Sequence, residues 1–290
     1  MTTRLASADW AAGRGAKWNA HLAGLEAMLA PLDGPLFRAL HLDAPCRIAD
    51  VGCGGGRATA AIARLAPAGS VVHGFDISPD LVASAGARHG SSARTLAFAV
   101  SDVATASAPD VLYDRLVSRF GILFFDYPPA AFANLARWLA PGGRLAFAVW
   151  GRPDDNPWTS SIRDVVTQFI DLPQPAPEAP GPFRYADAGT LVALLEDAGL
   201  ARLDVHDWRG ALSLGGGLAA AEAAHFALAS SSVGELVADA GDQVSDAVRD
   251  ALTTRFSRHE QDGSVRMDAC VHIVTGAHAG GRGRVSLPSV

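Results

Sequence analysis

Short apolar segments alternate with helical patterns over residues 46–150, and this alternation constrains the fold more than any other feature of the chain. Nearly continuous apolar runs predict strands at 47–51, 70–77, 95–102, 114–120 and 144–150. Helical patterns separate these runs at 57–66, from residue 79 onward and at 128–143, with Pro or Gly near their ends. Apolar strands with helices between them predict a parallel sheet that is covered on both faces.

The pattern changes after residue 150. Residues 152–182 are rich in proline around one amphipathic segment, whereas residues 218–260 look entirely helical. A helix at 187–200 and a strand at 201–208 are predicted between these two segments. Residues 264–277 alternate between apolar and polar side chains, which predicts a late antiparallel strand with unequal faces.

These elements predict a single α/β domain with a seven-stranded, mostly parallel sheet, one antiparallel strand and helices on both faces. The predicted parts are N-terminal helices at 1–45, a ligand-binding core at 46–150, helical cap insertions at 151–182 and 218–260, the rest of the sheet at 183–217 and 261–278, and a tail at 279–290.

Composition and charge exclude several classes of partner. The formal net charge of −6 disfavours a nucleic acid or an anionic membrane as the main partner. The first ten residues lack a signal peptide's apolar core, and no segment reaches the roughly 18 apolar residues that span a bilayer. Cys46, Cys53 and Cys270 lie far apart without metal-ligand spacing. We therefore expect a cytoplasmic protein with free thiols, no metal site and no membrane insertion.

The first predicted strand runs directly into "VGCGGGRATA", which holds four glycines between Gly52 and Gly56. Free backbone N–H groups and the positive end of a helix favour a nucleotide-like ligand at such a turn. A phosphate-binding P-loop needs Lys-Ser/Thr after its last glycine, but Arg57 and Ala58 stand there. A dinucleotide fingerprint needs a third glycine where this chain has Arg57 or Thr59. Both of these readings are therefore disfavoured.

The remaining pattern, Asp-Val-Gly-Cys-Gly-Gly-Gly at 50–56, resembles the first motif of the class I S-adenosylmethionine-dependent methyltransferases. "FDIS" at 75–78, "VSD" at 100–102, "YDRLVSRFGILFF" at 113–125 and "LAPGGRLAFAVW" at 139–150 resemble later landmarks of this family, in the same order. The chain looks similar to the small-molecule, UbiE-like type. The resemblance implies a Rossmann-like class I methyltransferase fold, with S-adenosylmethionine as cofactor and residues 46–150 as the cofactor-binding core.

The resemblance also implies roles for particular residues. Asp76 would receive the ribose hydroxyls, Ile77 would pack on the adenine, and Asp102 would reach the adenine amino group. Asp50 would orient the loop or meet the methionine ammonium group. The complete predicted set is Asp50, Gly52, Cys53, Gly54, Gly56, Asp76, Ile77, Asp102, Val103, Ser118 and Arg119.

The acceptor and the catalytic group are less constrained. Methyl transfer from a sulfonium can rely on alignment and desolvation, and a general base helps only where the acceptor must lose a proton. The catalytic residue is therefore unassigned, with His225, Asn156 and Trp158 as candidates, and Trp150 beside the last two at the site edge. Trp10 and Trp18 are expected to close over the cofactor or to pack in the core.

The predicted function is methylation of a small molecule such as a secondary metabolite, a quinone or a lipid-like compound. Two alternatives stay open: a non-catalytic, cofactor-binding regulatory module, and an NAD(P)-dependent oxidoreductase. A homodimer is a further expectation.

Overall fold

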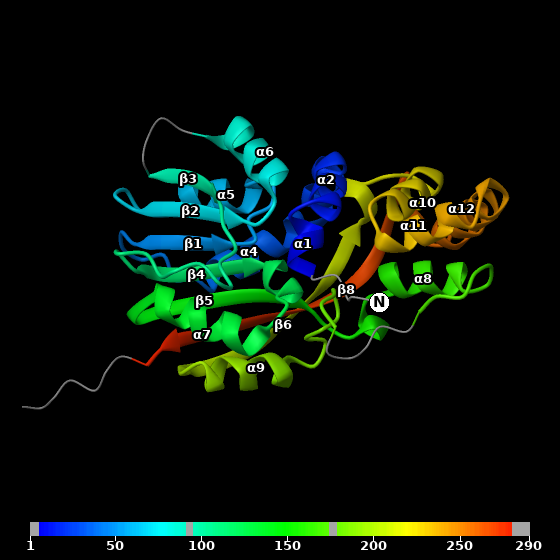
Figure 1. The fold of residues 1–290 in the computed structure, drawn as a ribbon. Coiled ribbons are helices and arrows are strands. Elements are labelled where there is room, and N and C mark those ends of the chain that lie inside the picture. Colours follow the sequence, from blue (N-terminus) through cyan, green and yellow to red (C-terminus); the bar gives the residue numbers. More distant parts are fainter. Residues whose placement is uncertain (1–5, 91–94, 174–178, 280–290) are drawn as a thin grey trace, which may run out of the picture.

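The computed structural model describes residues 6–90, 95–173 and 179–279. A mixed sheet forms its centre, with the strand order β3-β2-β1-β4-β5-β8-β6 (Figure 1). The strands are β1 (Arg47–Val51), β2 (Val71–Asp76), β3 (Leu96–Val100), β4 (Tyr113–Arg119), β5 (Leu139–Trp150), β6 (Leu200–Ser213) and β8 (Ser264–His278). Strand β8 runs antiparallel to both of its neighbours, whereas β1 to β5 are parallel. The predicted sheet is confirmed, and a two-residue strand β7 (Glu260–Gln261) adds a short hairpin to β8.

Helices cover the sheet as the alternating pattern predicts. Helices α5 (Arg57–Leu65) and α6 (Pro79–His89) pack on β2, and α6 also contacts β3. Helix α7 (Pro128–Trp138) packs on β5, and α9 (Ala188–Asp197) packs on β6 and β8. The carboxyl ends of the parallel strands therefore meet at one edge, between these helical layers.

The N-terminal segment is helical, as expected. It comprises α1 (Ala6–Trp10), α2 (Gly13–Ala20), α3 (Leu22–Leu29), the 3₁₀ turn η1 (Ala30–Leu32) and α4 (Asp33–Arg38). Figure 1 shows α1 and α2 beyond the carboxyl ends of the parallel strands, between the sheet and a group of later helices. These later helices are α8 (Pro157–Val166), α10 (Ala220–Ala229), α11 (Ser232–Asp239) and α12 (Asp242–Ser257). None of the described helices is long and apolar enough to cross a bilayer.

The predicted helix at 128–143 is too long. Helix α7 ends at Trp138, and β5 begins at Leu139 and runs through the Pro-Gly-Gly segment. The pairing of β5 with β4 shifts register there, from Tyr113↔Leu139 to Arg115↔Arg144. Gly142, with φ of 77°, allows this irregularity because glycine adopts positive φ without steric cost. The Pro-Gly-Gly segment therefore forms a bulge within β5 and does not end a helix.

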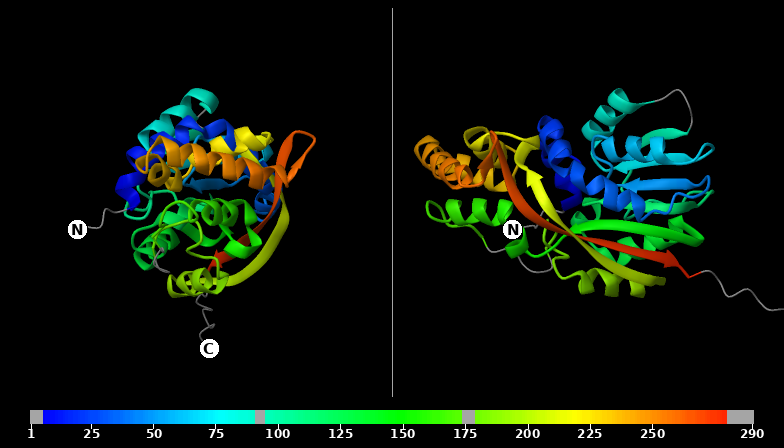
Figure 2. Two further views of the ribbon diagram at one scale, coloured as in Figure 1. Left: turned by 90° about the vertical axis from the view of Figure 1, so that its right-hand side faces the viewer. Right: turned by 180° about the vertical axis from the view of Figure 1, so that it is seen from behind.

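The two outer strands depart from the expectation that both faces are covered. Strand β3 lies at one edge of the sheet, and Val100 at its end is 53% exposed. Strand β6 lies at the other edge and alternates largely between half-buried and exposed residues. Figure 2 shows β6 and β8 running side by side beyond the parallel part of the sheet. The apolar core therefore centres on the inner strands, whose pattern of burial is nearly continuous in β1 and β5. The predicted tail lies outside the described residues except for residue 279.

Candidate functional site

The glycine loop connects β1 to α5 and lies close to two other segments. Gly52 has φ of 71°, and a Cβ at this position would lie 2.6 Å from the Cα of Gly121, which follows β4. The backbone N–H groups of Gly52 and Cys53 both donate to the carbonyl oxygen of Phe75, at 2.8 and 2.9 Å. The loop is therefore held against the ends of β2 and β4, in a conformation that only glycine fits at residue 52.

Asp76 ends β2 and fixes the same loop from the side. One of its carboxylate oxygens, Oδ2, accepts the Gly54 N–H at 2.9 Å, and Oδ1 accepts the Ser78 N–H at 2.9 Å. Burial raises the pKa of this carboxyl, and these backbone hydrogen bonds oppose the shift. Each carboxylate oxygen has a further lone pair. Asp76 can therefore receive additional donors from a ligand beside the loop.

Asp50 lies in β1 and is 2% exposed. The Thr59 hydroxyl donates to its Oδ2 at 2.6 Å. Burial raises the pKa of the Asp50 carboxyl to about 6, and the Thr59 hydrogen bond and the Arg119 charge act against this shift. At neutral pH, Asp50 therefore carries a poorly solvated negative charge, which favours a cationic group facing it.

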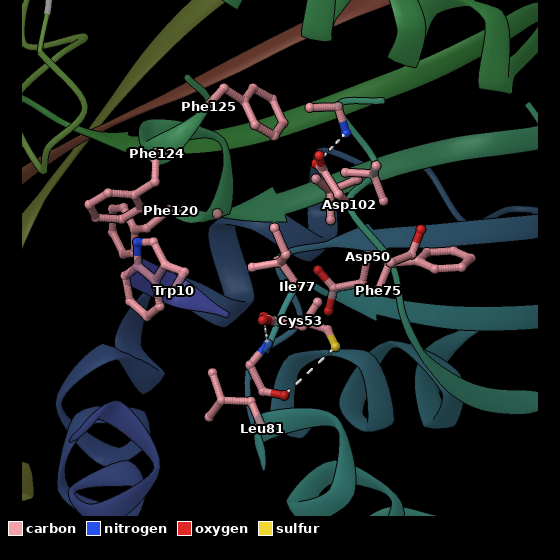
Figure 3. Close-up of a pocket in the computed structure, with 18 of the residues that line it drawn as sticks. Trp10, Asp50, Cys53, Phe75, Ile77, Leu81, Asp102, Phe120, Phe124 and Phe125 are labelled. Atoms are coloured by element: carbon pink, nitrogen blue, oxygen red, sulfur yellow. Dashed lines mark hydrogen bonds between the residues drawn. The ribbon is translucent and has the colours of Figure 1, made fainter. Parts of the chain in front are cut away.

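Asp102 follows β3 and forms a compact turn. Its Oδ1 accepts the Ala104 N–H at 3.0 Å, and its Oδ2 accepts the Thr105 hydroxyl at 2.8 Å. Figure 3 shows Asp50, Ile77 and Asp102 around one space, although they come from the ends of three neighbouring strands. The sheet thus brings together acids that are 26 residues apart or more in the sequence.

The two residues predicted at the end of β4 have different positions. Ser118 is fully buried, and its hydroxyl donates to the Val51 carbonyl at 2.7 Å, so it joins β4 to β1. Arg119 borders the cavity described below, and its guanidinium donates to Asp33 Oδ1 at 2.6 Å. Desolvation by burial raises the pKa of Asp33, against the attraction of Arg119 and Arg57. Arg119 is therefore an ion-pair partner for α4.

Aromatic side chains from the N-terminal helices cover this region. The Trp10 ring centroid lies 4.9 Å from that of Phe124 and 5.7 Å from that of Trp18. Helix α1 is anchored at its first turn, because the Asp126 carboxylate accepts the N–H groups of Ala6 and Ser7 at 2.7 and 3.3 Å. Trp10 and Trp18 both face the cavity, next to the segment that follows β4.

A partly buried ion pair joins the N-terminal helices to the glycine loop. Glu26 on α3 is 6% exposed and accepts two hydrogen bonds from Arg88 on α6, at 2.6 and 2.9 Å. Arg88 also donates to the Gly55 carbonyl at 3.1 Å. The positions of α3, α6 and the loop are therefore coupled.

These elements enclose a cavity of about 320 Å³. Nine of the eleven predicted cofactor residues line it: Asp50, Gly52, Cys53, Gly54, Asp76, Ile77, Asp102, Val103 and Arg119. Gly56 and Ser118 lie behind the lining. At Gly56, which precedes α5, a Cβ would meet Phe98 and Ala85 within 2.8 Å.

The residues suggested for acceptor binding or catalysis lie elsewhere. Asn156 is fully buried, and its side chain bonds the backbone of Gly151, Arg152 and Cys270. Trp158 packs on Trp150, with ring centroids 4.9 Å apart. His225 borders a separate shallow pocket with His21 and Phe226.

The described parts of 151–182 and 218–260 contribute no lining residue to the cavity. Its roof is instead formed by residues 7–29 and 120–131, a set that we call the roof segments. Sequence reasoning missed the aromatic residues of the second segment as lining residues. The sequence pattern that could have indicated them is "FGILFFDY" at 120–127, which has four aromatic side chains directly after a strand end. These are Phe120, Phe124, Phe125 and Tyr127.

Comparisons with known proteins agree with this architecture. Residues 26–205 match the family model of a methyltransferase domain. A trans-aconitate 2-methyltransferase of Streptomyces avermitilis is 40% identical over 115 residues, which are 38% of this chain and 41% of that protein. The chain thus spans less than half the length of the first curated relatives it matches.

Solved structures show the same fold at low sequence identity. A methyltransferase-like protein from Bacillus halodurans has a TM-score of 0.56 at 16% identity, over 85% of this chain and 98% of that one. A phosphoethanolamine N-methyltransferase of Haemonchus contortus, solved with S-adenosylhomocysteine, has a TM-score of 0.52 at 15% identity, over 88% of this chain and 56% of that one. The UbiE-like subtype stays a prediction. The family match and the shared fold together show that this chain belongs to the methyltransferase domain family, with the architecture of class I S-adenosylmethionine-dependent methyltransferases.

Proposed function

We propose that the chain binds S-adenosylmethionine in the 320 Å³ cavity and transfers its methyl group to a small molecule. The observation that carries this proposal is the meeting of Asp50, Asp76 and Asp102 beside one glycine loop. This cofactor offers a ribose diol, an adenine amino group and an ammonium group, all of which donate hydrogen bonds. The acids at the three strand ends accept such donors, and charge-assisted hydrogen bonds of this kind are strong.

The same charges disfavour a dinucleotide. Its phosphates would meet the negative carboxylates of Asp50 and Asp76 next to the loop. Arg119, the one arginine among the described lining residues, is already paired with Asp33 at 2.6 Å. The donor groups of S-adenosylmethionine therefore suit these residues better than NAD(P) does.

The lining supports a mechanism based on alignment. The bound cofactor would supply an activated methyl group. Each acid that lines the cavity already accepts a hydrogen bond from the protein, and no histidine is among the lining residues that the structure describes. These acids are Glu26, Asp50, Asp76, Asp102 and Asp126. The protein would thus orient the acceptor and exclude water rather than remove a proton.

Two properties of the acceptor follow. The aromatic roof favours a molecule with an apolar body, such as a secondary metabolite, a quinone or a lipid-like compound. The absence of a histidine from the described lining residues favours an acceptor atom that is already unprotonated at neutral pH, such as a carboxylate oxygen. The cytoplasmic location and the homodimer stay predictions from the sequence.

Calorimetric binding of S-adenosylhomocysteine tests the cofactor site. We expect binding by the wild type and a loss of about 10-fold to 100-fold in Asp76→Asn, because a charged hydrogen-bond partner contributes roughly 1.5–3 kcal/mol. Asp110→Asn removes the same charge from an exposed loop position and should bind as the wild type does. Folded wild type that binds NAD(P) instead of S-adenosylhomocysteine would support the oxidoreductase and refute the proposal.

Transfer of a labelled methyl group to a panel of carboxylate, hydroxyl and amine acceptors tests the reaction. Transfer to an apolar carboxylate that is lost in Asp76→Asn would support the full proposal. Tight cofactor binding without transfer to any member of a broad panel would favour the regulatory module.

A further inference from the structure

A carboxylate, a thiol and an imidazole come together on two neighbouring strands, outside the cavity. Asp207 on β6 pairs in register with His272 on β8, and Cys270 lies two residues before His272. Since side chains two residues apart on a strand share a face, all three project to the same side of the sheet. Ligand atoms of the three residues all lie within 4.8 Å of one another.

The hydrogen bonds of His272 define which ring nitrogen is available. Its Nε2 lies 3.2 Å from the Ala186 carbonyl oxygen, and a carbonyl can only accept, so Nε2 carries a proton. Its Nδ1 lies 2.6 Å from Asp207 Oδ1. Two lone pairs cannot face each other at this distance, so a proton lies between the two atoms, and a metal ion bound to both would replace it. In metal sites, the second ring nitrogen of a histidine ligand donates to a carbonyl or a carboxylate, as Nε2 does here.

The same residue types also form nucleophilic triads, but this geometry differs from a triad. In a triad, the histidine nitrogen opposite the acid faces the nucleophile. Here that nitrogen, Nε2, is bonded to Ala186. Cys270 is 1% exposed, so its thiol is not accessible to a substrate. The cluster is therefore better suited to bind an ion than to attack a substrate.

The charges around the cluster match a divalent ion. A deprotonated Cys270 and Asp207 contribute two negative charges, with a neutral imidazole as the third ligand. Arg209 lies 3.7 Å from Asp207 Oδ2, but it makes two shorter contacts with Asp155, at 3.0 and 3.2 Å. The Asp207 side chain is 41% exposed, which leaves room for a water molecule as a fourth ligand.

We propose that Cys270, His272 and Asp207 form a binding site for a divalent, borderline-soft metal ion such as Zn²⁺. Zinc sites use these three ligand types in a tetrahedron, with ligand atoms about 3.3–3.7 Å apart as the usual bond lengths require. The Cys270 Sγ to Asp207 Oδ2 separation is 3.9 Å and the His272 to Asp207 contact is 2.6 Å, so modest side-chain rotations suffice. The bound ion would tie β6, β8 and the segment before α9 together.

The sequence alone predicted no metal site, because the cysteines lack metal-ligand spacing. The site becomes visible only through the strand pairing, which brings Asp207 next to residues that are more than 60 positions away. This inference does not depend on the proposed methyl transfer.

Calorimetry with Zn²⁺ and absorption spectroscopy with Co²⁺ on the full chain, treated with a chelator and dialysed, test the site. We expect one Zn²⁺ per chain and a near-ultraviolet thiolate-to-Co²⁺ charge-transfer band. Zn²⁺ at about 100 times the Kd should raise the Tm by about 5 °C. Cys270→Ser should abolish the Co²⁺ band, and Asp207→Asn should weaken Zn²⁺ binding by about 10-fold or more.

Cys46→Ser is the matched control, since Cys46 is also a buried free thiol but lies beside β1. It should keep the band and the Zn²⁺ affinity. The exposed position of Asp207 makes Asp207→Asn a variant that folds even if Cys270→Ser does not. Absence of Zn²⁺ binding by the wild type would overturn the proposal. So would Zn²⁺ binding by Asp207→Asn with wild-type affinity, or a Co²⁺ band that disappears only in Cys46→Ser.

Discussion

The buried charge of Asp50 has a cost in stability that a single substitution can reveal. Burial raises the pKa of this carboxyl from 3.8 to about 6. At about 1.36 kcal/mol for each pKa unit, ionised Asp50 destabilises the folded state by about 3 kcal/mol. Asp50→Asn removes the charge and keeps an oxygen that can accept the Thr59 hydroxyl. We therefore expect Asp50→Asn to raise the free energy of unfolding at neutral pH by up to this amount.

The expected gain depends on pH in a defined direction. The carboxyl has a higher pKa in the folded state than in the unfolded state, so the folded state binds the proton more tightly. The stability from this group is complete below pH 4 and is lost as the pH rises through about 6. The difference between Asp50→Asn and the wild type should thus be small near pH 4 and should reach its full size by about pH 7.

Urea unfolding at pH values from 4 to 8 measures this difference. At pH 7.5 the variant should also melt higher, by up to about 6–12 °C, given roughly 2–4 °C for each kcal/mol in a chain of this size. Asp110→Asn, at an exposed position, is the control for the loss of one negative charge and should show no such pH-dependent gain. A variant less stable than the wild type at pH 7.5, or a gain of equal size at all pH values, would refute the reasoning.

Three further predictions concern the frame of the site. Gly52→Ala should lower the Tm and abolish S-adenosylhomocysteine binding, because its Cβ would lie 2.6 Å from Gly121 Cα; differential scanning calorimetry and binding titration measure both effects. Asp126→Ala should cost about 1 kcal/mol, as the loss of a helix cap does, and should speed proteolysis within residues 6–12, since α1 loses two hydrogen bonds. Asn156→Ala should cost at least about 3 kcal/mol in urea unfolding, because four backbone groups lose their partner, while the folded protein keeps its cofactor affinity.

The sequence motifs, with the family resemblance they carry, located one side of the cavity because their determinants are local. Asp50, Asp76 and Asp102 each follow from a strand end and a turn within a few residues, and parallel strands place such ends at one edge. The order of landmarks along the chain was therefore enough to predict which residues face the cavity. Gly56 and Ser118 were assigned by the same reasoning but lie behind the lining, where Gly56 packs against Phe98 and Ala85 and Ser118 bonds the Val51 carbonyl.

Apart from Trp10 and Trp18, which were expected over the cofactor or in the core, the roof could not be predicted in the same way, because its contacts join distant parts of the chain. Asp126 bonds the first turn of α1 across 119 and 120 residues, and Glu26 pairs with Arg88 across 62 residues. Asn156 reaches Cys270 across 114 residues. A polar residue in a loop offers the same local pattern whether it faces a ligand or a backbone far away. The sequence therefore predicts a pocket residue at Asn156, although its side chain forms hydrogen bonds with the backbone.

We expect acceptor specificity to depend on the roof segments and not on the cap insertions. The cap insertions expected at 151–182 and 218–260 contribute nothing to the cavity lining in their described parts, whereas the roof segments contribute Trp10, Trp18, Phe120, Phe124 and Phe125. The N-terminal roof segment, residues 7–29, packs on α6 and β6, and the polar contacts of Asp126 and Glu26 add to this packing. Because α1 and α2 line the cavity and α10 to α12 do not, exchange of α1 and α2 should alter acceptor choice more than exchange of α10 to α12.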